Sequence, residues 1–167
     1  DCIFGERDDT FSDAVGRALR DKGLTVALAE SCTGGLAATM LTNVPGSSDY
    51  VLLSAVAYAN SAKSRMLGVN PEVIRAHGAV SAEVAAEMAE GARRISGASL
   101  AVSITGIAGP GGGSGDTPVG TVWFGIAMDG QPTVTRHRLF PGERDQIRTL
   151  AAYTALRIMM RSALGQL

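Results

Sequence analysis

Histidine, cysteine and lysine are scarce in this chain of 167 residues. There are two of each, at His77 and His137, Cys2 and Cys32, and Lys22 and Lys63. Two cysteines cannot form a disulfide framework, and two histidines without cysteine or carboxylate spacing around them match no metal-binding motif. We therefore expect no metal site.

Long apolar runs and an excess of one charge are also missing. Fifteen basic and sixteen acidic residues give a formal net charge of −1, and the aromatic residues are one Trp, three Tyr and four Phe. This balance provides no general attraction for nucleic acid and no stripe of basic and aromatic residues. No segment approaches the ~20 apolar residues that cross a bilayer, and no signal-peptide pattern is seen. We expect a cytoplasmic protein that binds neither nucleic acid nor membrane.

Hydrophobic residues are plentiful, at 46% of the chain with a mean hydropathy of +0.15, which is enough for one domain with a sizeable core. Helix and strand patterns alternate along the chain, and a hairpin around Asp129-Gly130 follows. We expect helices over residues 10–22, 33–43, 62–67, 81–94 and 143–164, a helical turn from Asn70-Pro71, and strands over residues 24–29, 50–60, 99–105, 119–128 and 133–140. This order predicts a three-layer α/β/α sandwich with a mixed, mostly parallel sheet.

The segment Ala-Glu-Ser-Cys-Thr-Gly-Gly, residues 29–35, lies where a strand pattern turns into a helix pattern. Its Ser31 and Cys32 are possible nucleophiles beside the unpaired N–H groups of the following helix, which can stabilise an oxyanion or hold a phosphate. The pair Gly34-Gly35 lets a ligand approach the backbone closely. Alternatively, Ser31 or Thr33 only caps the helix.

A serine hydroxyl needs a base, and Lys63 is the candidate. Lysine can lose its proton in a protein site whereas arginine cannot, and Lys63 follows an apolar strand, unlike Lys22 in a polar helix end. A desolvated Lys63 can be neutral near pH 7 and accept the proton of Ser31, with Tyr58 positioning groups or relaying the proton. This requires the strands ending at Ala29 and near Tyr58 to be neighbours. Otherwise Lys63 extends to solvent and the Tyr58 hydroxyl is solvated.

Two other interpretations of Tyr58, Lys63 and Cys32 are weaker. Tyr58 and Lys63 resemble the Tyr-x-x-x-Lys pair of short-chain dehydrogenases, but they are five residues apart and the chain has no G-x-G-x-x-G turn near its start. Cys32 competes with Ser31 because a thiol near a helix N-terminus can have a lowered pKa. No His or Asp partner pattern accompanies it, so we favour Ser31.

Two further segments could bind an anion. The loop Thr105-Gly-Ile-Ala-Gly-Pro-Gly-Gly-Gly113 follows a strand and can wrap a nucleotide or phosphate with backbone N–H groups, although a flexible surface loop has the same composition. It lacks the Gly-Lys-Ser/Thr of a P-loop, which argues against ATP hydrolysis. Arg144 and Arg148, one helical turn apart, could face an anionic ligand, or could be solvated and paired to Glu143 and Asp145.

Six motifs in order closely resemble the CinA C-terminal domain family over residues 10–163. They are Ala29 to Gly35, Tyr58-Ala-Asn-Ser-Ala-Lys63, Leu67-Gly-Val69, Gly78-Ala-Val-Ser81, Thr105-Gly-Ile-Ala-Gly-Pro110 and Pro118-Val-Gly-Thr-Val122. The resemblance implies a nicotinamide-nucleotide amidohydrolase of pyridine nucleotide salvage. Such an enzyme hydrolyses the carboxamide of nicotinamide mononucleotide to nicotinate mononucleotide and ammonia, with no cofactor.

The resemblance also implies roles for particular residues. Ser31 matches the catalytic serine, Lys63 the lysine and Tyr58 the tyrosine. We expect Ser31 to attack the amide, Lys63 to act as base, and backbone N–H groups from Cys32 to Gly34 to stabilise the oxyanion. The expected substrate-binding residues are Cys32, Thr33, Gly34, Gly35, Thr105, Gly106, Gly109, Gly112 and Arg144. Phosphate contact by Arg144 is our own hypothesis.

The chain opens on Asp1 rather than Met, and we interpret it as part of a longer protein. Residues 1–9 resemble the segment that joins this family to an N-terminal domain like those that bind molybdopterin cofactor, and residues 10–167 form a single domain. The family resemblance also implies a homo-oligomer. Two alternatives stay open: a non-catalytic nucleotide-binding or assembly domain of a competence- or damage-inducible protein, and a hydrolase that uses Cys32.

Overall fold

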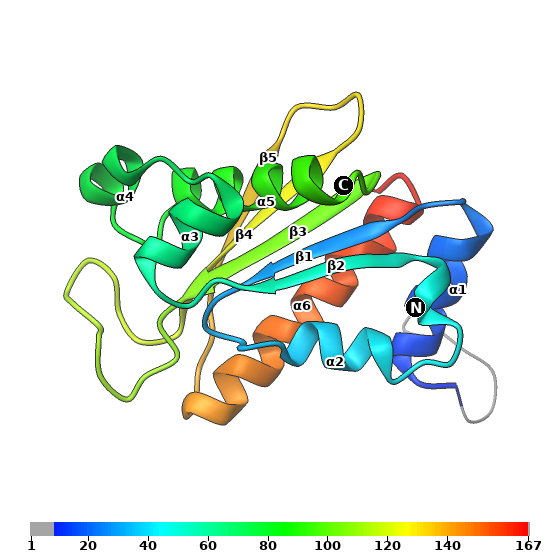
Figure 1. Cartoon of the computed structure of the whole chain (residues 1–167). Coiled ribbons are helices and arrows are strands. Elements are labelled where there is room, and N and C mark those ends of the chain that lie inside the picture. The colour runs from blue at the N-terminus through cyan, green and yellow to red at the C-terminus, as the bar shows by residue number, and fades with distance from the viewer. Residues whose placement is uncertain (1–8, 167) are drawn as a thin grey trace.

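The computed structural model describes residues 9–166, which contain six α-helices, one short 3-10 helix and five strands (Figure 1). The helices are α1 (Phe11–Asp21), α2 (Leu36–Thr42), η1 (Ser47–Asp49), α3 (Asn60–Leu67), α4 (Pro71–His77), α5 (Ala82–Ser96) and α6 (Arg144–Ala163). The strands are β1 (Val26–Glu30), β2 (Val51–Val56), β3 (Leu100–Gly106), β4 (Thr121–Met128) and β5 (Val134–Leu139). The expected order of elements is confirmed. The linker expected at residues 1–9 lies outside the described residues apart from Asp9.

Two elements are much shorter than their sequence patterns. The strand expected over residues 50–60 stops at Val56, and the helix expected over residues 33–43 begins three residues late. Gly34 and Gly35 adopt positive φ angles of 62° and 95°, which glycine reaches without steric cost. They turn the chain between β1 and α2, so the glycine pair belongs to the turn and not to the helix.

The sheet has the strand order β2-β1-β3-β4-β5. Strand β1 pairs in parallel with β2 and β3, while β4 is antiparallel to both β3 and β5. Four strands therefore run one way and β4 runs against them, which confirms a mixed, mostly parallel sheet. Because β2, β1 and β3 are parallel neighbours, their carboxyl ends lie at one edge of the sheet.

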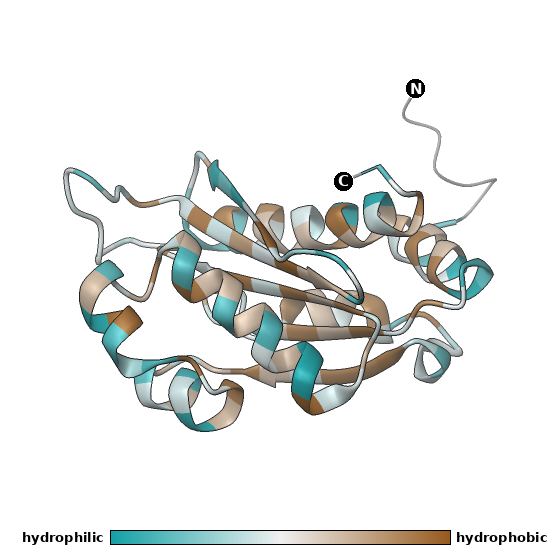
Figure 2. Ribbon diagram, turned by 90° about the horizontal axis from the view of Figure 1, so that it is seen from above, coloured by the Kyte–Doolittle hydropathy of each residue, from teal (hydrophilic) through white to brown (hydrophobic). Residues whose placement is uncertain are grey.

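Helices cover both faces of the sheet and complete the expected α/β/α sandwich. Helices α3, α4 and α5 lie on one side, and α1, α2 and α6 lie on the other (Figure 1). Figure 2 shows apolar residues along the central strands, whereas the helices alternate between apolar and polar residues. No helix within residues 9–166 is long and apolar enough to cross a membrane.

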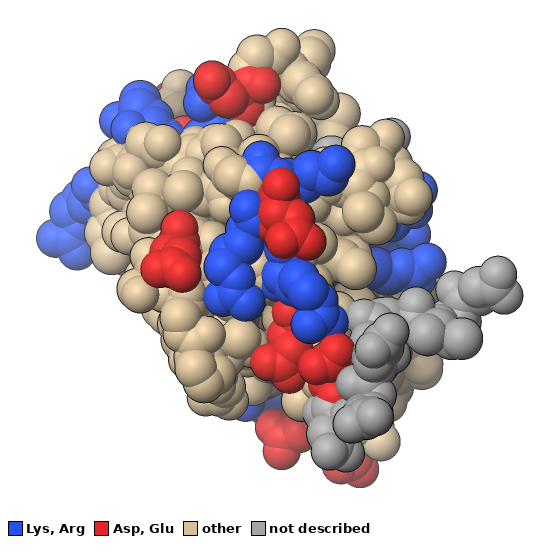
Figure 3. Space-filling view, turned by 90° about the vertical axis from the view of Figure 1, so that its right-hand side faces the viewer, with Lys and Arg blue, Asp and Glu red and all other residues tan. Residues whose placement is uncertain are grey.

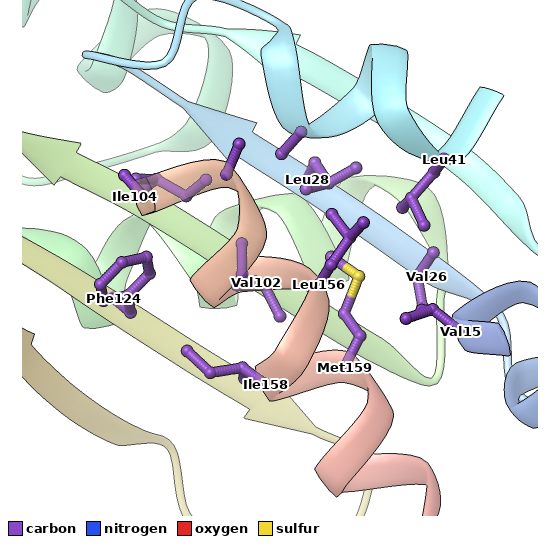
Figure 4. Packing of buried hydrophobic residues seen from close by; sticks show 14 of the residues in the cluster. Val15, Val26, Leu28, Leu41, Val102, Ile104, Phe124, Leu156, Ile158 and Met159 are labelled. Carbon is purple, nitrogen blue, oxygen red and sulfur yellow. The ribbon is translucent and has the colours of Figure 1, made fainter. Parts of the chain in front are cut away.

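Each face of the sheet has its own hydrophobic core, because successive strand residues point to opposite sides. On the α6 side, branched and aromatic strand residues such as Leu28, Val102 and Phe124 form one cluster with Leu156 and Met159 of α6 (Figure 4). On the α5 side, the strands contribute mostly alanines, Ala27, Ala29, Ala55 and Ala101, against helix residues that include Met88. The small strand side chains allow α5 to lie close to the sheet.

Close packing of α5 also fixes the position of α3. A Cβ atom at Gly91 would overlap the backbone carbonyl of Leu67 at the end of α3, and Arg94 Nη2 donates to the same carbonyl over 3.1 Å. Glycine at this position therefore lets the end of α3 rest directly on α5. Helix α3 carries Lys63, so this contact helps to place the candidate base.

Candidate active site

Ser31 follows the last residue of β1, at the edge where the parallel strands end. Its backbone N–H donates to Ile104 O in β3 over 2.9 Å, and its carbonyl accepts from Gly34 N over 3.0 Å. The residue is 8% exposed. Bonds to a neighbouring strand and to the following turn therefore hold the serine in place, with its hydroxyl near the surface.

Lys63, in the first turn of α3, is buried and bonded to Ser31. Its Nζ lies 3.1 Å from Ser31 Oγ, 2.9 Å from Ala57 O and 3.2 Å from Tyr58 O. Only 1% of the residue is exposed, and no ion pair joins it to a carboxylate in the part of the chain that the structure describes. A buried lysine without a counter-charge is costly to protonate.

Burial lowers the pKa of Lys63, and the nearby Cys32 opposes this shift more weakly. A neutral amine has two N–H groups and one lone pair. The carbonyls of Ala57 and Tyr58 can accept the two N–H groups, which leaves the lone pair facing Ser31 Oγ. The surroundings of Lys63 thus suit a neutral amine that accepts the proton of the serine hydroxyl.

Tyr58 lies at the open side of the site, with 58% of the residue exposed. Its hydroxyl accepts from Arg144 Nη2 over 3.2 Å, while Arg144 Nη1 donates to Gly109 O over 2.8 Å. The contact of Tyr58 with Lys63 is made by its backbone carbonyl. These bonds favour a positioning role for Tyr58 over a proton relay, and they bring the first residue of α6 to the site.

A cavity of about 200 Å³ opens onto Ser31 and Lys63. Its walls come from the ends of β1 and β3, the β2–α3 connection, the loop before α5, and α6. The lining residues are Ser31, Cys32, Tyr58, Asn60, Lys63, Ala79, Val80, Thr105, Gly106, Ala108 and Arg144. No cluster of three or more His, Cys, Asp or Glu side chains suited to a metal occurs among residues 9–166.

The N-terminus of α2 is occupied by Glu30, which is fully buried. Its carboxylate accepts from the backbone N–H groups of Gly35, Ala37 and Ala38 at 2.9, 3.2 and 2.8 Å. The expectation that this helix end faces a ligand is therefore wrong. Of the predicted oxyanion donors, the Gly34 N–H already donates to Ser31 O. The N–H groups of Cys32 and Thr33 have no oxygen acceptor within the described residues; they lie near the Cys32 thiol, whose pKa they lower, and they remain as candidate oxyanion donors.

Comparisons with known proteins identify the family of the chain. The profile of the CinA C-terminal domain family matches residues 8–163. This chain belongs to that family. A CinA-like protein of Geobacter sulfurreducens is 53% identical over 164 residues, which cover 98% of this chain and 40% of that protein. One from Geobacter metallireducens is 52% identical over 157 residues, or 94% of this chain and 38% of that protein. The chain thus spans about 40% of the length of these curated relatives.

Solved structures of CinA proteins share the fold. The crystal structure of a competence-damaged protein (CinA) superfamily member from Klebsiella pneumoniae is 33% identical with a TM-score of 0.89, covering 93% of this chain and 96% of that one. A competence/damage-inducible protein from Agrobacterium tumefaciens is 39% identical with a TM-score of 0.84, covering 93% and 98%. This family member therefore shares its fold with these structures over most of both chains.

The structure brings only part of the expected substrate-binding set to the cavity. Cys32, Thr105, Gly106 and Arg144 line it, and the Thr105 hydroxyl donates to Ala79 O over 2.7 Å, so this side chain secures the wall. The other expected residues do not line the cavity. Thr33 is buried, and Gly34 and Gly35 form the turn before α2. Gly109 contacts the site only through its carbonyl, which accepts from Arg144, and Gly112 belongs to the glycine-rich loop. Arg148 donates to Thr33 O over 3.0 Å and is likewise outside the cavity.

Cys32 is poorly suited to be the nucleophile in this CinA family domain. The residue is 5% exposed, and burial raises the pKa of its thiol to about 11. The backbone N–H groups of Cys32 and Thr33 lower it by less, and the Glu30 carboxylate raises it further. A thiol with such a pKa is almost entirely protonated at neutral pH. The electrostatics of the site therefore favour Ser31.

Glu30 is the important residue that the sequence analysis missed. We expect Glu30→Gln to lower the free energy of unfolding by about 2–4 kcal/mol, because the amide has one acceptor oxygen and its NH₂ group would face backbone donors. Urea denaturation followed by circular dichroism measures the change. The matched control is Asp116→Asn in an exposed loop, where we expect a change within ~0.5 kcal/mol. Equal stabilities for the two variants would contradict this role of Glu30.

Proposed function

We propose that this domain hydrolyses the carboxamide of nicotinamide mononucleotide to nicotinate mononucleotide and ammonia. The observation that carries the proposal is the buried Lys63 amine, 3.1 Å from Ser31 Oγ and without a carboxylate partner among the described residues. A serine with a neutral lysine base is a suitable pair for acyl transfer from an amide. The substrate itself is inferred from the family resemblance of the motifs that contain these two residues.

In the first half of the reaction, Ser31 Oγ attacks the amide carbon while Lys63 Nζ accepts the hydroxyl proton. The backbone N–H groups of Cys32 and Thr33 stabilise the oxyanion, and loss of one such donor typically costs about 3 kcal/mol in the barrier. When the C–N bond breaks, Lys63 returns the proton to the leaving amine, which departs as ammonia. The product of this half is an ester of Ser31.

In the second half, water replaces the amine. Lys63 accepts a proton from the water as its oxygen attacks the ester carbonyl, and the same backbone N–H groups stabilise the new oxyanion. The C–O bond to Ser31 breaks, Lys63 returns the proton to Oγ, and nicotinate mononucleotide leaves as the carboxylic acid, which then gives up its proton to solvent to form the carboxylate. One water is consumed and one ammonia is released for each amide cleaved.

The direct test is to incubate the purified domain with nicotinamide mononucleotide, without added metal, and to measure both products. We expect ammonia and nicotinate mononucleotide in equal amounts. Saturable binding of the nucleotide by folded protein, with no ammonia released, would contradict the enzyme and support the alternative of a nucleotide-binding domain. Release of nicotinamide instead of ammonia would indicate cleavage of the glycosidic bond and would also contradict the proposal.

Arg144 is the candidate for the substrate phosphate, because its guanidinium lies at the open side of the cavity between Tyr58 and Gly109. We expect Arg144→Ala to raise KM for the mononucleotide about tenfold or more, with a smaller change in kcat, since a phosphate contact is lost far from the reacting carbon. The riboside, which lacks the phosphate, should be affected much less. Arg65→Ala on the exposed side of α3 is the control. Equal losses for both substrates would argue against phosphate contact.

We also propose that the intact protein carries an N-terminal domain like those that bind molybdopterin cofactor, and that it acts in the cytoplasm as a homo-oligomer. The greater length of the relatives supports an additional domain. Light scattering of the intact protein measures its oligomeric state, and a monomer at working concentrations would contradict this part of the proposal.

A further inference from the structure

A second basic site lies between edge strand β5 and helix α6. A groove of about 170 Å³ there is lined by Arg136, Arg138, Thr154, Arg157, Ile158 and Arg161. Four of its six lining residues are arginines, and none is acidic. Arg157 is thirteen residues along α6 from Arg144, which corresponds to about 20 Å of helix. The groove is therefore separate from the cavity at Ser31 and Lys63.

The register of the sheet explains why these arginines meet. Arg136 and Arg138 lie opposite Phe124 and Val122 of β4, and cross-strand partners share one face of a sheet. Phe124 and Val122 belong to the core on the α6 side. The two strand arginines therefore point to the same side as α6.

Helix α6 presents a matching stripe. Thr154, Arg157, Ile158 and Arg161 follow the spacing i, i+3, i+4 and i+7, which places them on one face of a helix. This face borders the outer strand of the sheet. Two pairs of arginines, one from each element, thus line a single groove.

Within the described part of the chain, three of these four arginines make hydrogen bonds to carbonyls, and none of the four makes an ion pair. Arg136 and Arg138 donate to the carbonyls of Thr135 and His137, Arg161 donates to Gln166 O, and no ion pair to any of the four exists within residues 9–166. Other parts of the surface are mixed in sign. In the middle of the face shown in Figure 3, Lys and Arg lie directly beside Asp and Glu.

Like charges at i and i+4 on a helix, and at i and i+2 on one face of a strand, repel each other. Such an arrangement is relieved when an anion binds between them. Guanidinium groups recognise phosphate oxygens through paired N–H donors, and several phosphate groups offer more acceptors than one carboxylate does. Four arginines around a groove of this size suit a small ligand of high negative charge.

We propose that the β5–α6 groove binds a ligand with adjacent phosphate groups, such as a di- or polyphosphate, at a site distinct from Ser31 and Lys63. The proposal does not depend on the amidohydrolase activity. It requires only that the arginines remain accessible, and Arg136 and Arg138 are exposed in the structure.

Calorimetric titration of the whole chain with pyrophosphate tests the site. We expect saturable binding that weakens steeply with salt and falls at least tenfold in the double variant Arg157→Gln, Arg161→Gln. The variants Ser31→Ala and Arg144→Ala should keep the saturable binding that the double variant loses, because neither residue lines the groove. The matched control is Arg17→Gln, which removes a surface arginine that pairs with Asp9.

The proposal would be overturned by a lack of saturable binding to the folded wild type, by loss of binding in Arg144→Ala, or by orthophosphate binding as tight as pyrophosphate. If the helix double variant does not fold, Arg136→Gln with Arg138→Gln replaces it, because both side chains lie on an exposed edge strand. Unchanged binding in the folded replacement would count equally against the site.

Discussion

Replacement of Ser31 by alanine is expected to lower ammonia release from nicotinamide mononucleotide by about 10³-fold or more while the domain stays folded. The hydroxyl oxygen of Ser31 is the atom that would form the ester. Among the described residues, no other hydroxyl forms a hydrogen bond with Lys63 Nζ. Alanine removes one oxygen at a site near the surface, so it leaves the packing of β1 unchanged. Initial rates of ammonia release measure the loss, and circular dichroism verifies the fold.

Cys32→Ala is the matched control, because it changes the neighbouring residue by one sulfur atom. We expect this variant to keep most of the wild-type activity, since the buried thiol is protonated at neutral pH. If Ser31→Ala still released ammonia and Cys32→Ala did not, Cys32 would be the nucleophile, and the proposed mechanism would be contradicted.

The second large effect is expected at Lys63. Lys63→Met should lower turnover as much as Ser31→Ala does, because methionine fills the space of the buried lysine side chain but cannot accept a proton. Stability should change by only ~1 kcal/mol. Two effects on the stability oppose each other: removal of the buried amine stabilises the fold, and loss of the hydrogen bonds to the carbonyls of Ala57 and Tyr58 destabilises it. Lys63→Arg is the companion variant, and it should also be inactive because arginine keeps its proton.

The pH dependence of the wild type follows from the same group. Burial lowers the pKa of Lys63 from its ordinary value of 10.5, and only the neutral amine can act as base, so kcat/KM should rise with pH through the lowered pKa and then level off. Stability should rise in the same direction. Between the folded and unfolded pKa values the unfolded chain binds a proton that the folded protein lacks. Lys63→Met should remove this part of the slope, and an unchanged slope would contradict a titrating Lys63.

The order of elements could be read from the sequence because its signals are local. Alternating strand and helix patterns, the turn at Asp129-Gly130 and the Asn70-Pro71 helix start depend on a few neighbouring residues. The predicted strand over residues 50–60 extends past the end of β2 at Val56, because the apolar pattern continues there: Ala57 lies beyond the strand and is still fully buried. An apolar residue indicates burial, but burial does not require a strand.

The parts of the site that sequence analysis missed depend on tertiary contacts. In the sequence, Glu30 is an acidic residue directly after the strand predicted over residues 24–29. Its role becomes visible only when the chain turns back so that the N–H groups of Gly35 and Ala38 reach its carboxylate. The groove of arginines likewise requires the register of β4 with β5. By contrast, the pairing of Ser31 with Lys63 could be anticipated, because parallel neighbouring strands bring their carboxyl ends together.

The contact between Gly91 and Leu67 has a consequence for protein engineering. A side chain larger than hydrogen at position 91 would overlap the Leu67 carbonyl at the end of α3, and α3 carries Lys63, so we expect a substitution there to change the separation of Lys63 Nζ and Ser31 Oγ. The proposed reactivity should therefore respond to a residue that does not line the cavity. Libraries aimed at new amide substrates should include position 91 together with the cavity walls.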